Sequence, residues 1–340
     1  GIYLLILSRF LPFRYFGHAI QVLRGKYDDP DDPGQISHFQ ALTTALSATV
    51  GMGNISGVAV AIAMGGPGAI FWMWISAVVG MSTKFFTSSL AIMYRGKDSE
   101  GELQGGPMYF ITEGLGKKWK PLAIFFSACA MIGALPVFNV NQLTQAVNDI
   151  LLKPNGVEVT NYTNLVIGVF LVIITSIVVL GGLKRIGKVT SRLVPSMVLL
   201  YFILVVVILI VHIEVVPKYF LMIFTDAFSA DFIKEESVLG GVVGALIILG
   251  IKRGAFSNEA GVGTAPMAHG AAKTDEPVRE GLVAMLGPFI DTIIVCTLTA
   301  LAILVTEVWQ TTDTNGVSLT ATAFGNAMPG VGKYLLMICV

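Results

Sequence analysis

The chain has 340 residues, of which 54% are apolar and only 13% are charged, whereas charged residues make up about 25% of an ordinary soluble domain. This composition predicts a protein that crosses a membrane several times and excludes a typical soluble domain. The formal net charge is zero, which argues against a nucleic-acid partner, and the three cysteines lie in apolar runs without the spacing or neighbouring histidines of a metal site.

Both ends of the sequence fall in apolar runs. Residues 2–7 are too few to be the apolar core of a signal peptide, and we expect them to be the tail of a leading membrane helix. Residues 334–340 are also apolar, so we expect the sequence to be a fragment trimmed at both ends. Residues 1–35 then carry four basic side chains and are expected to lie on the cytoplasmic face.

The next apolar segment is interrupted near its centre. Residues 36–65 are nearly uncharged and long enough to cross a bilayer, but they contain the sequence SATVGMGN at residues 47–54. Each glycine lowers helix propensity by about 1 kcal/mol relative to alanine, so the helix is expected to unwind there. Irregular backbone at membrane depth is tolerated only where protein buries it or where it lines a wet cavity. The break is therefore a candidate binding site.

Four further helices are predicted next, at residues 69–95, 122–152, 165–182 and 193–212. The second of these carries amide side chains on a surface that would otherwise suit lipid. They are Asn139, Asn141, Gln142, Gln145 and Asn148. A longer amphipathic connection follows at residues 214–237.

A second interrupted segment, residues 239–272, repeats the first arrangement. Residues 254–263 break its apolar run and place three polar side chains at membrane depth, Ser257, Asn258 and Glu259. Paired glycine-interrupted segments in matching positions of two halves are typical of the substrate site of an inverted-repeat secondary transporter. A seventh helix is predicted near residues 281–308, and an eighth begins near Gly330.

The positive charges support this arrangement of spans. Of the 22 Lys and Arg residues, 15 fall in loops on one predicted side, four fall on the other, and three fall inside spans. The three are Lys84, Lys252 and Arg253. Because a cation at mid-bilayer costs about 2.5–3.5 kcal/mol, we expect them to pair with Glu259 and Asp291 in a structural or gating ion pair, in preference to direct proton transport.

The sequence resembles a known family. The stretch GPGAIFWMWIS at residues 66–76 resembles the signature of the alanine or glycine to cation symporters, the sodium:alanine symporter family. The sequences GMGNI at residues 51–55, KRG at 252–254, FSNEAG at 256–261 and FIDT at 289–292 agree with the same family, in the right order and almost from end to end.

The resemblance implies an all-α polytopic membrane protein with a leucine-transporter-like fold. In that fold a leading helix precedes two inverted five-helix repeats, and helices 1 and 6 are discontinuous at the substrate site. Residues 1–35 would be the end of the leading helix and the cytoplasmic segment, and residues 36–212 the first repeat. Residues 213–238 would be an extracellular connection, and residues 239–340 a truncated second repeat with helices 6, 7 and the start of 8. The hydroxyl groups of helix 8 that share the sodium site would lie beyond Val340.

The resemblance also implies a function. It predicts a secondary active transporter in the cell membrane, not an enzyme, which carries a small neutral amino acid, alanine or glycine, together with sodium by alternating access. The expected partners are the amino acid, the sodium ion and the lipid bilayer, with sodium as coupling ion and no other cofactor.

Half-helix ends supply the groups that a zwitterion needs, because free amides at a helix N-terminus attract a carboxylate and free carbonyls at a C-terminus attract an ammonium. We expect the backbone around the first break to hold the carboxylate, and carbonyls near Ala48 and Phe256 with the Ser257 hydroxyl to hold the ammonium. Met52 and Phe256 would keep the side-chain pocket small. The predicted substrate residues of the two breaks are Thr49, Gly51, Met52, Gly53, Asn54, Phe256, Ser257 and Asn258.

Sodium prefers oxygen ligands, and the first break offers several. The carbonyls of Ser47 and Val50, with the Thr49 carbonyl and the Asn54 side chain, are the predicted sodium ligands. From the third helix we add two substrate residues, Asn139 and Asn141. Asn139 stands where many family members have a glutamine that reaches the substrate, and this shorter amide leaves the exact amino acid open.

Simpler interpretations remain at this stage. The glycines of the first break could serve close helix packing, and Asn54 and Asn258 could be interhelical hydrogen-bonding groups. An ion channel would need a continuous polar path, and an intramembrane enzyme would need a nucleophile beside a base, neither of which the sequence indicates. Among transporters, the alternative is a proton- or sodium-coupled carrier of another small amino acid, such as glutamine or serine.

Overall fold

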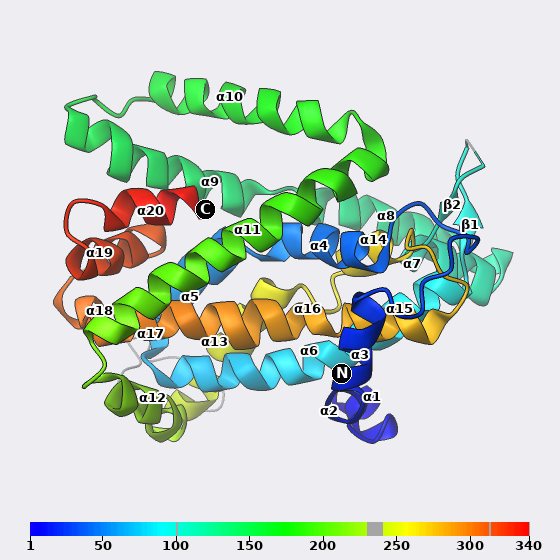
Figure 1. Cartoon of the computed structure of the whole chain (residues 1–340), viewed down its shortest axis with the longest axis horizontal. Helices are drawn as coiled ribbons and strands as arrows, with labels where there is room; N and C mark the ends of the chain where they lie inside the picture. Colours follow the sequence, from blue (N-terminus) through cyan, green and yellow to red (C-terminus); the bar gives the residue numbers. More distant parts are fainter. Residues whose placement is uncertain (100, 230–240, 313, 340) are drawn as a thin grey trace.

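A computed structural model of the chain describes residues 1–99, 101–229, 241–312 and 314–339. Regular structure in these residues is almost entirely helical (Figure 1). The strands are two short ones, β1 (Gly96–Lys97) and β2 (Leu103–Gln104), which pair antiparallel. The predicted all-α polytopic membrane protein is confirmed at this level.

Within the described residues, five helical runs are long and apolar enough to cross a membrane. They are α6 (Gly68–Met93), the run Lys117–Asn155, α10 (Asn161–Val179), α11 (Gly182–Val211) and the run Pro277–Val305. The pair α4 (His38–Thr49) and α5 (Met52–Gly65) counts as a sixth span if its two parts, bent by 42°, are taken together. These six match predicted helices 1 to 5 and 7.

Apart from the sixth predicted helix, the other helices described outside these spans are shorter and connect or cap them. They are α1 (Ile2–Leu7), α2 (Leu11–Arg14), α3 (Phe16–Leu23), α7 (Pro107–Tyr109), α12 (Val216–Thr225), α18 (Val308–Thr311), α19 (Val317–Ala327) and α20 (Gly332–Ile338). Helical turns of other pitch occur at Phe110–Gly114, Lys117–Trp119, Asn148–Leu152, Lys153–Asn155, Asp226–Phe228 and Phe289–Cys296. The helix α19 lies in a stretch where the sequence indicated none.

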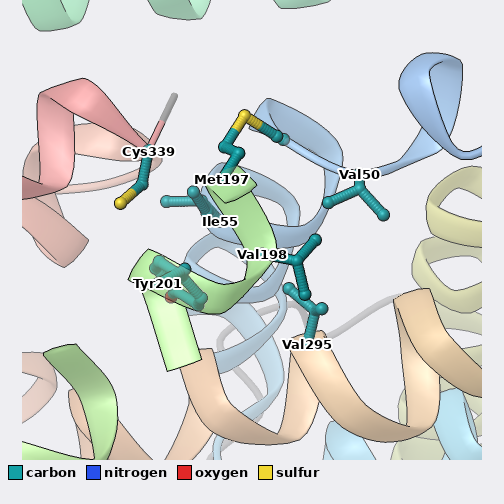
Figure 2. A pocket seen from close by; sticks show the side chains of 8 residues that line it. Val50, Ile55, Met197, Val198, Tyr201, Val295 and Cys339 are labelled. Atoms are coloured by element: carbon teal, nitrogen blue, oxygen red, sulfur yellow. The ribbon is translucent and has the colours of Figure 1, made fainter. Parts of the chain in front are cut away.

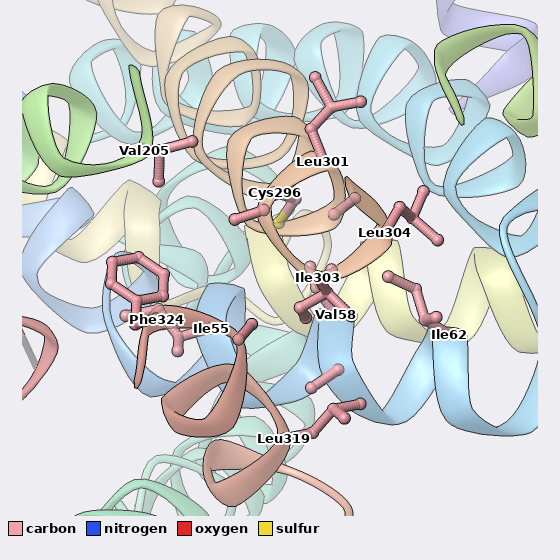
Figure 3. Packing of buried hydrophobic residues seen from close by; sticks show 14 of the residues in the cluster. Ile55, Val58, Ile62, Val205, Cys296, Leu301, Ile303, Leu304, Leu319 and Phe324 are labelled. Carbon is pink, nitrogen blue, oxygen red and sulfur yellow. The ribbon is translucent and has the colours of Figure 1, made fainter. Parts of the chain in front are cut away.

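The central packing surrounds α5. Its side chains Ile55, Val58 and Ile62 contact residues of α11, α17 (Thr297–Val305) and α19, as Figure 3 shows. Fully buried alanines on both sides, among them Ala59 and Ala300, let the backbones approach closely. In a bilayer, where lipid is as apolar as leucine, this close van der Waals contact is what holds helices together.

The predicted third helix is bent at a proline. It divides into α8 (Lys120–Gly133) and α9 (Val137–Val147), with Pro136 between them. Proline lacks the N–H that would continue the helix, and its ring clashes with the preceding turn. The prediction of one continuous helix over residues 122–152 is therefore wrong. Next to α9, α10 runs along one edge of the molecule and buries none of its residues (Figure 1). An apolar helix that buries none of its residues is suited to lipid and not to water.

The sixth predicted helix is interrupted over a shorter stretch than expected. It consists of α13 (Gly241–Asn258) and α14 (Thr264–His269), so Gly254 to Asn258 are helical and the break begins at Glu259. The predicted segment starts at residue 239 and the predicted connection ends at residue 238; both positions lie outside the described residues.

Close packing explains the helical glycine. A Cβ on Gly254 would lie 2.7 Å from the Ser76 Cβ and 3.1 Å from the Met73 Cα, both on α6. Gly254 therefore brings α13 against α6 and does not unwind its own helix, which corrects the assignment of this residue to the break.

Replacing Gly254 with alanine is expected to lower stability by about 1–3 kcal/mol, because the new methyl group overlaps the α6 backbone. Thermal unfolding in detergent, followed by tryptophan fluorescence, measures this as a lower Tm. Gly168→Ala on α10 is the control, since nothing lies within 4 Å of its Cβ. Equal Tm values for the two variants would contradict this packing.

Candidate functional site

The first break is made by an extended residue and a glycine. The helix α4 ends at Thr49, Val50 is extended (φ −82°, ψ 122°), and Gly51 has φ 142° and ψ −126° before α5 begins at Met52. Residues other than glycine rarely adopt such a φ, so this position requires glycine. The predicted interruption between residues 47 and 54 is therefore present.

The second break is a loop of five residues. Glu259, Gly261 and Gly263 all have positive φ, at 51°, 99° and 101°. Asn258 closes the end of α13, because its Oδ1 accepts a hydrogen bond from the Ala260 amide at 3.0 Å. The Glu259 carboxylate accepts a hydrogen bond from Thr264 Oγ1 at 2.6 Å, at the start of α14.

A buried polar cluster joins the two broken helices to the seventh span. The Ser257 hydroxyl lies 3.5 Å from Asn54 Oδ1 and 3.2 Å from Thr292 Oγ1. Asn54 Nδ2 donates to the Asp291 carbonyl at 2.8 Å. All four residues are fully buried. Two segments about 200 residues apart in sequence thus meet at one depth.

Asp291 brings an acidic group to this cluster. One of its carboxylate oxygens, Oδ1, accepts from the Thr292 hydroxyl, and the Thr49 side chain interacts with the same carboxyl group. The other, Oδ2, is buried without a hydrogen-bond partner in the described part of the chain. A buried acceptor of this kind is suited to a cation or a proton.

Lys84 on α6 supplies the nearest positive charge. It is fully buried and interacts electrostatically with Asp291 and Glu259, the two carboxylates expected to face the cations inside the spans. No ion pair within 4.0 Å joins them in the described residues, so the pairing is looser than predicted. Lys252 is exposed and Arg253 half-buried, which makes the expectation of three buried cations wrong for these two.

The other predicted site residues divide into two groups. Thr49, Val50, Gly51, Met52 and Gly53 are buried at the first break, whereas Ser47 is exposed on α4. Phe256 is 45% exposed; its ring meets that of Phe138 on α9 edge to face, with centroids 5.1 Å apart.

The third-helix amides lie farther from the break than the rest. Asn139 is half-buried and Asn141 exposed on α9, and none of the described contacts links them to either break. Gln142 makes the link that the sequence did not single out: its Oε1 accepts from Ser56 of α5 and, at 3.2 Å, from the Val317 amide of α19. One helical turn past Asn139, it occupies the face that turns inward.

A small apolar cavity lies behind the first break. Val50 of the break converges on it with Ile55 of α5, Val198 and Tyr201 of α11, and Val295 of the seventh span (Figure 2). Its volume is about 10 Å³, which holds one water molecule at most and excludes an amino acid.

The far ends of α4 and α14 are also tied together. His269 is fully buried, and its Nδ1 is hydrogen-bonded to the carboxylate of Glu280. The same carboxylate contacts His38, so these side chains join the ends of α4 and α14 that lie away from the breaks.

Comparison with known proteins identifies the family of the chain. Residues 1–340 match the family model described as the sodium:alanine symporter family. The chain belongs to this family. The sequence resemblance is thereby confirmed, and members of the family are transporters, not enzymes.

Three relatives illustrate the range of the sodium:alanine symporter family. The sodium/alanine symporter AgcS of Methanococcus maripaludis is 44% identical over 338 residues, which cover 97% of this chain and 71% of the relative. The probable sodium/glutamine symporter GlnT of Bacillus subtilis is 36% identical, with 100% of this chain and 68% of the relative covered. The putative sodium/proton-dependent alanine carrier protein YrbD of the same organism is 36% identical, with 98% and 68% covered.

Gly51→Ala is expected to abolish most of any transport activity, because the backbone at the break needs a φ that alanine rarely adopts. Space is not the obstacle, since nothing lies within 4 Å of the Gly51 Cβ. Gly57→Ala, on α5 with equal space and ordinary helical backbone, is the control and should keep full uptake in vesicles. If both variants transport equally well, the strained break is not needed.

Proposed function

We propose that this protein is a sodium-coupled symporter of a small neutral amino acid, alanine or glycine, that works by alternating access. The observation that carries the proposal is the buried cluster of Asn54, Ser257, Asp291 and Thr292, where two interrupted helices meet. Family membership supports sodium-dependent transport of this general kind. The basic segment within residues 1–35 would face the cytoplasm.

The backbone of the first break is the proposed site for the substrate carboxylate. The first amides of α5 have no partner within their own helix, and they attract an anion. The carbonyls at the end of α4, with the Ser257 hydroxyl, would receive the ammonium group. A zwitterion would then lie across the break with each charge facing the matching helix end.

Sodium would occupy the oxygen-rich side of the same break. The Asn54 side chain and the carbonyls of Ser47, Thr49 and Val50 are the proposed ligands. The geometry supports adding the Asp291 carboxylate, whose Oδ2 is buried and free of hydrogen bonds in the described residues. A carboxylate beside Asn54 would offset the charge of the ion in a site of low dielectric constant.

The driving force is sufficient for accumulation. One sodium ion that crosses 100 mV releases about 2.3 kcal/mol, and a tenfold sodium gradient adds about 1.4 kcal/mol. Together they support about 500-fold accumulation of a neutral solute.

Uptake of labelled alanine or glycine into proteoliposomes of the full-length protein is expected to require an inward sodium gradient. Replacing external sodium with choline should reduce uptake to the level of empty liposomes. Uptake that proceeds equally well in choline would refute sodium coupling, and a proton gradient imposed in choline tests the proton-coupled alternative.

Pocket size provides the substrate test. A methyl group added at Gly53 would point to Phe256, 3.9 Å from its Cε1, and would occupy space proposed for the substrate side chain. Gly53→Ala is therefore expected to lower the ratio of alanine to glycine uptake about tenfold, the usual effect of one methylene in a tight pocket.

Gly57→Ala, one turn farther along α5, should leave that ratio unchanged. A ratio unaffected by Gly53→Ala would remove Gly53 and Phe256 from the pocket. Glutamine is the competing substrate because one relative is named a probable sodium/glutamine symporter, and strong competition by glutamine in the wild type would favour it over alanine.

A further inference from the structure

We propose that Glu280 is a positioning residue that joins the half-helices α4 and α14, so that they move as one body during transport. The inference rests on the proposed function, because it concerns how the two broken helices move. It concerns the ends of these half-helices that lie away from the breaks.

The Glu280 side chain bridges two helices that are far apart in sequence. It is fully buried at the start of α15 (Pro277–Ala284). Its Oε2 is hydrogen-bonded to Nδ1 of His38, the first residue of α4, and its Oε1 to Nδ1 of His269, the last residue of α14. Both imidazoles are buried, at 2% and 0% exposure. Separating the helices would leave this buried carboxylate without a hydrogen-bond partner, which costs free energy.

Backbone pairing ties the same two segments. The amides of Gln35 and Ile36 donate to the Ala271 carbonyl at 2.8 and 3.3 Å, and the Lys273 amide donates to the Ile36 carbonyl at 2.7 Å. Ile36 and Ala272 form a parallel bridge. The residues that lead into α4 and those that follow α14 thus make a short ribbon.

Arg95, which follows α6, fastens this ribbon. Its guanidinium donates to the carbonyls of Gly270 at 2.8 Å, Pro33 at 3.1 Å and Thr274 at 2.8 Å, and also to that of Ala272. The planar fork of arginine suits such multiple bonding, which lysine could not reproduce. Glu280 on α15 and Arg95 after α6 therefore both tie the two half-helices together.

The charges around Glu280 are compatible with a permanent clamp. His38 Nε2 faces Asp28 at 3.7 Å, and Arg279 also lies near this ring. Burial lowers the pKa of Arg95, while the carboxylates of Glu280 and Asp32 oppose that shift, and a guanidinium stays charged at physiological pH.

His269 differs from His38. Its Nε2 is buried without a partner in the described residues, whereas Nε2 of His38 faces Asp28. Each imidazole nevertheless places its Nδ1 on a different oxygen of the Glu280 carboxylate.

A disulfide across the ribbon tests whether the half-helices separate. Ile36→Cys and Ala272→Cys place two thiols on paired strands about 4.8 Å apart, within reach of a disulfide. Cys129→Ser removes the exposed native cysteine and leaves the two buried ones. We expect oxidised and reduced forms to take up substrate within twofold of each other. A tenfold loss on oxidation, reversed by dithiothreitol, would overturn the proposal.

Rescue separates positioning from a general effect on folding. Glu280→Gln is expected to lower the maximal uptake rate about tenfold with little change in KM, and the oxidised disulfide in the same variant should restore most of that rate. Asp28→Asn is the control, because this exposed residue contacts His38 but lies outside the clamp. Failure of the disulfide to restore the rate in a protein of unchanged Tm would contradict the role of Glu280.

Hydrogen exchange measures the clamp without any substrate. In Glu280→Gln, peptides over residues 33–37 and 269–274 should lose amide protection together, and loss in only one of them would contradict a single body. Because this measurement needs no transport, failure of the wild type to carry alanine or glycine would count against the proposed function alone.

Discussion

The amide of Asn54 holds the first broken helix against the seventh membrane span, and the Ser257 hydroxyl brings the second broken helix to the same point. This small network is the constraint on which the arrangement depends, since an interrupted helix in lipid exposes amides and carbonyls that no solvent can satisfy. Packing around α5 fixes the depth of the network. The breaks are stable because other protein segments take the place of water.

Buried charge adds a second constraint. Lys84, Asp291 and Glu259 lie near one another inside the membrane domain, and each costs free energy unless it is compensated. Two carboxyl groups and one amine therefore meet beside the hydrogen-bond network of Asn54 and Ser257.

The sequence was informative where one residue type decides the local structure. Gly51 predicted the first break because residues other than glycine rarely adopt its backbone conformation. The apolar runs predicted the six spans. Gly254 was misassigned because a glycine that permits close packing looks the same in sequence as one that unwinds a helix. The helix α19 was missed because its Thr- and Ala-rich sequence has little apolar periodicity.

Contacts between distant residues were the main limit. Glu280 and His38 are 242 positions apart, and neither has a neighbour in sequence that signals the other. His269 is likewise held inside by a carboxylate eleven residues later, which no local pattern indicates. Gln142 was counted among five similar amides, and only the fold distinguishes the one that reaches α5.

The wide helical turn at Phe289–Cys296 carries Asp291 and Thr292. Such a π-helical turn contains one residue more than an α-helix of the same rise would need. Loss of a single residue from this turn would let it relax to an α-helix of nearly the same rise, with the turns on either side left in place. The extra residue is therefore not needed to cross the membrane or to orient α17, and what it changes is the placement of Asp291 and Thr292 within the turn.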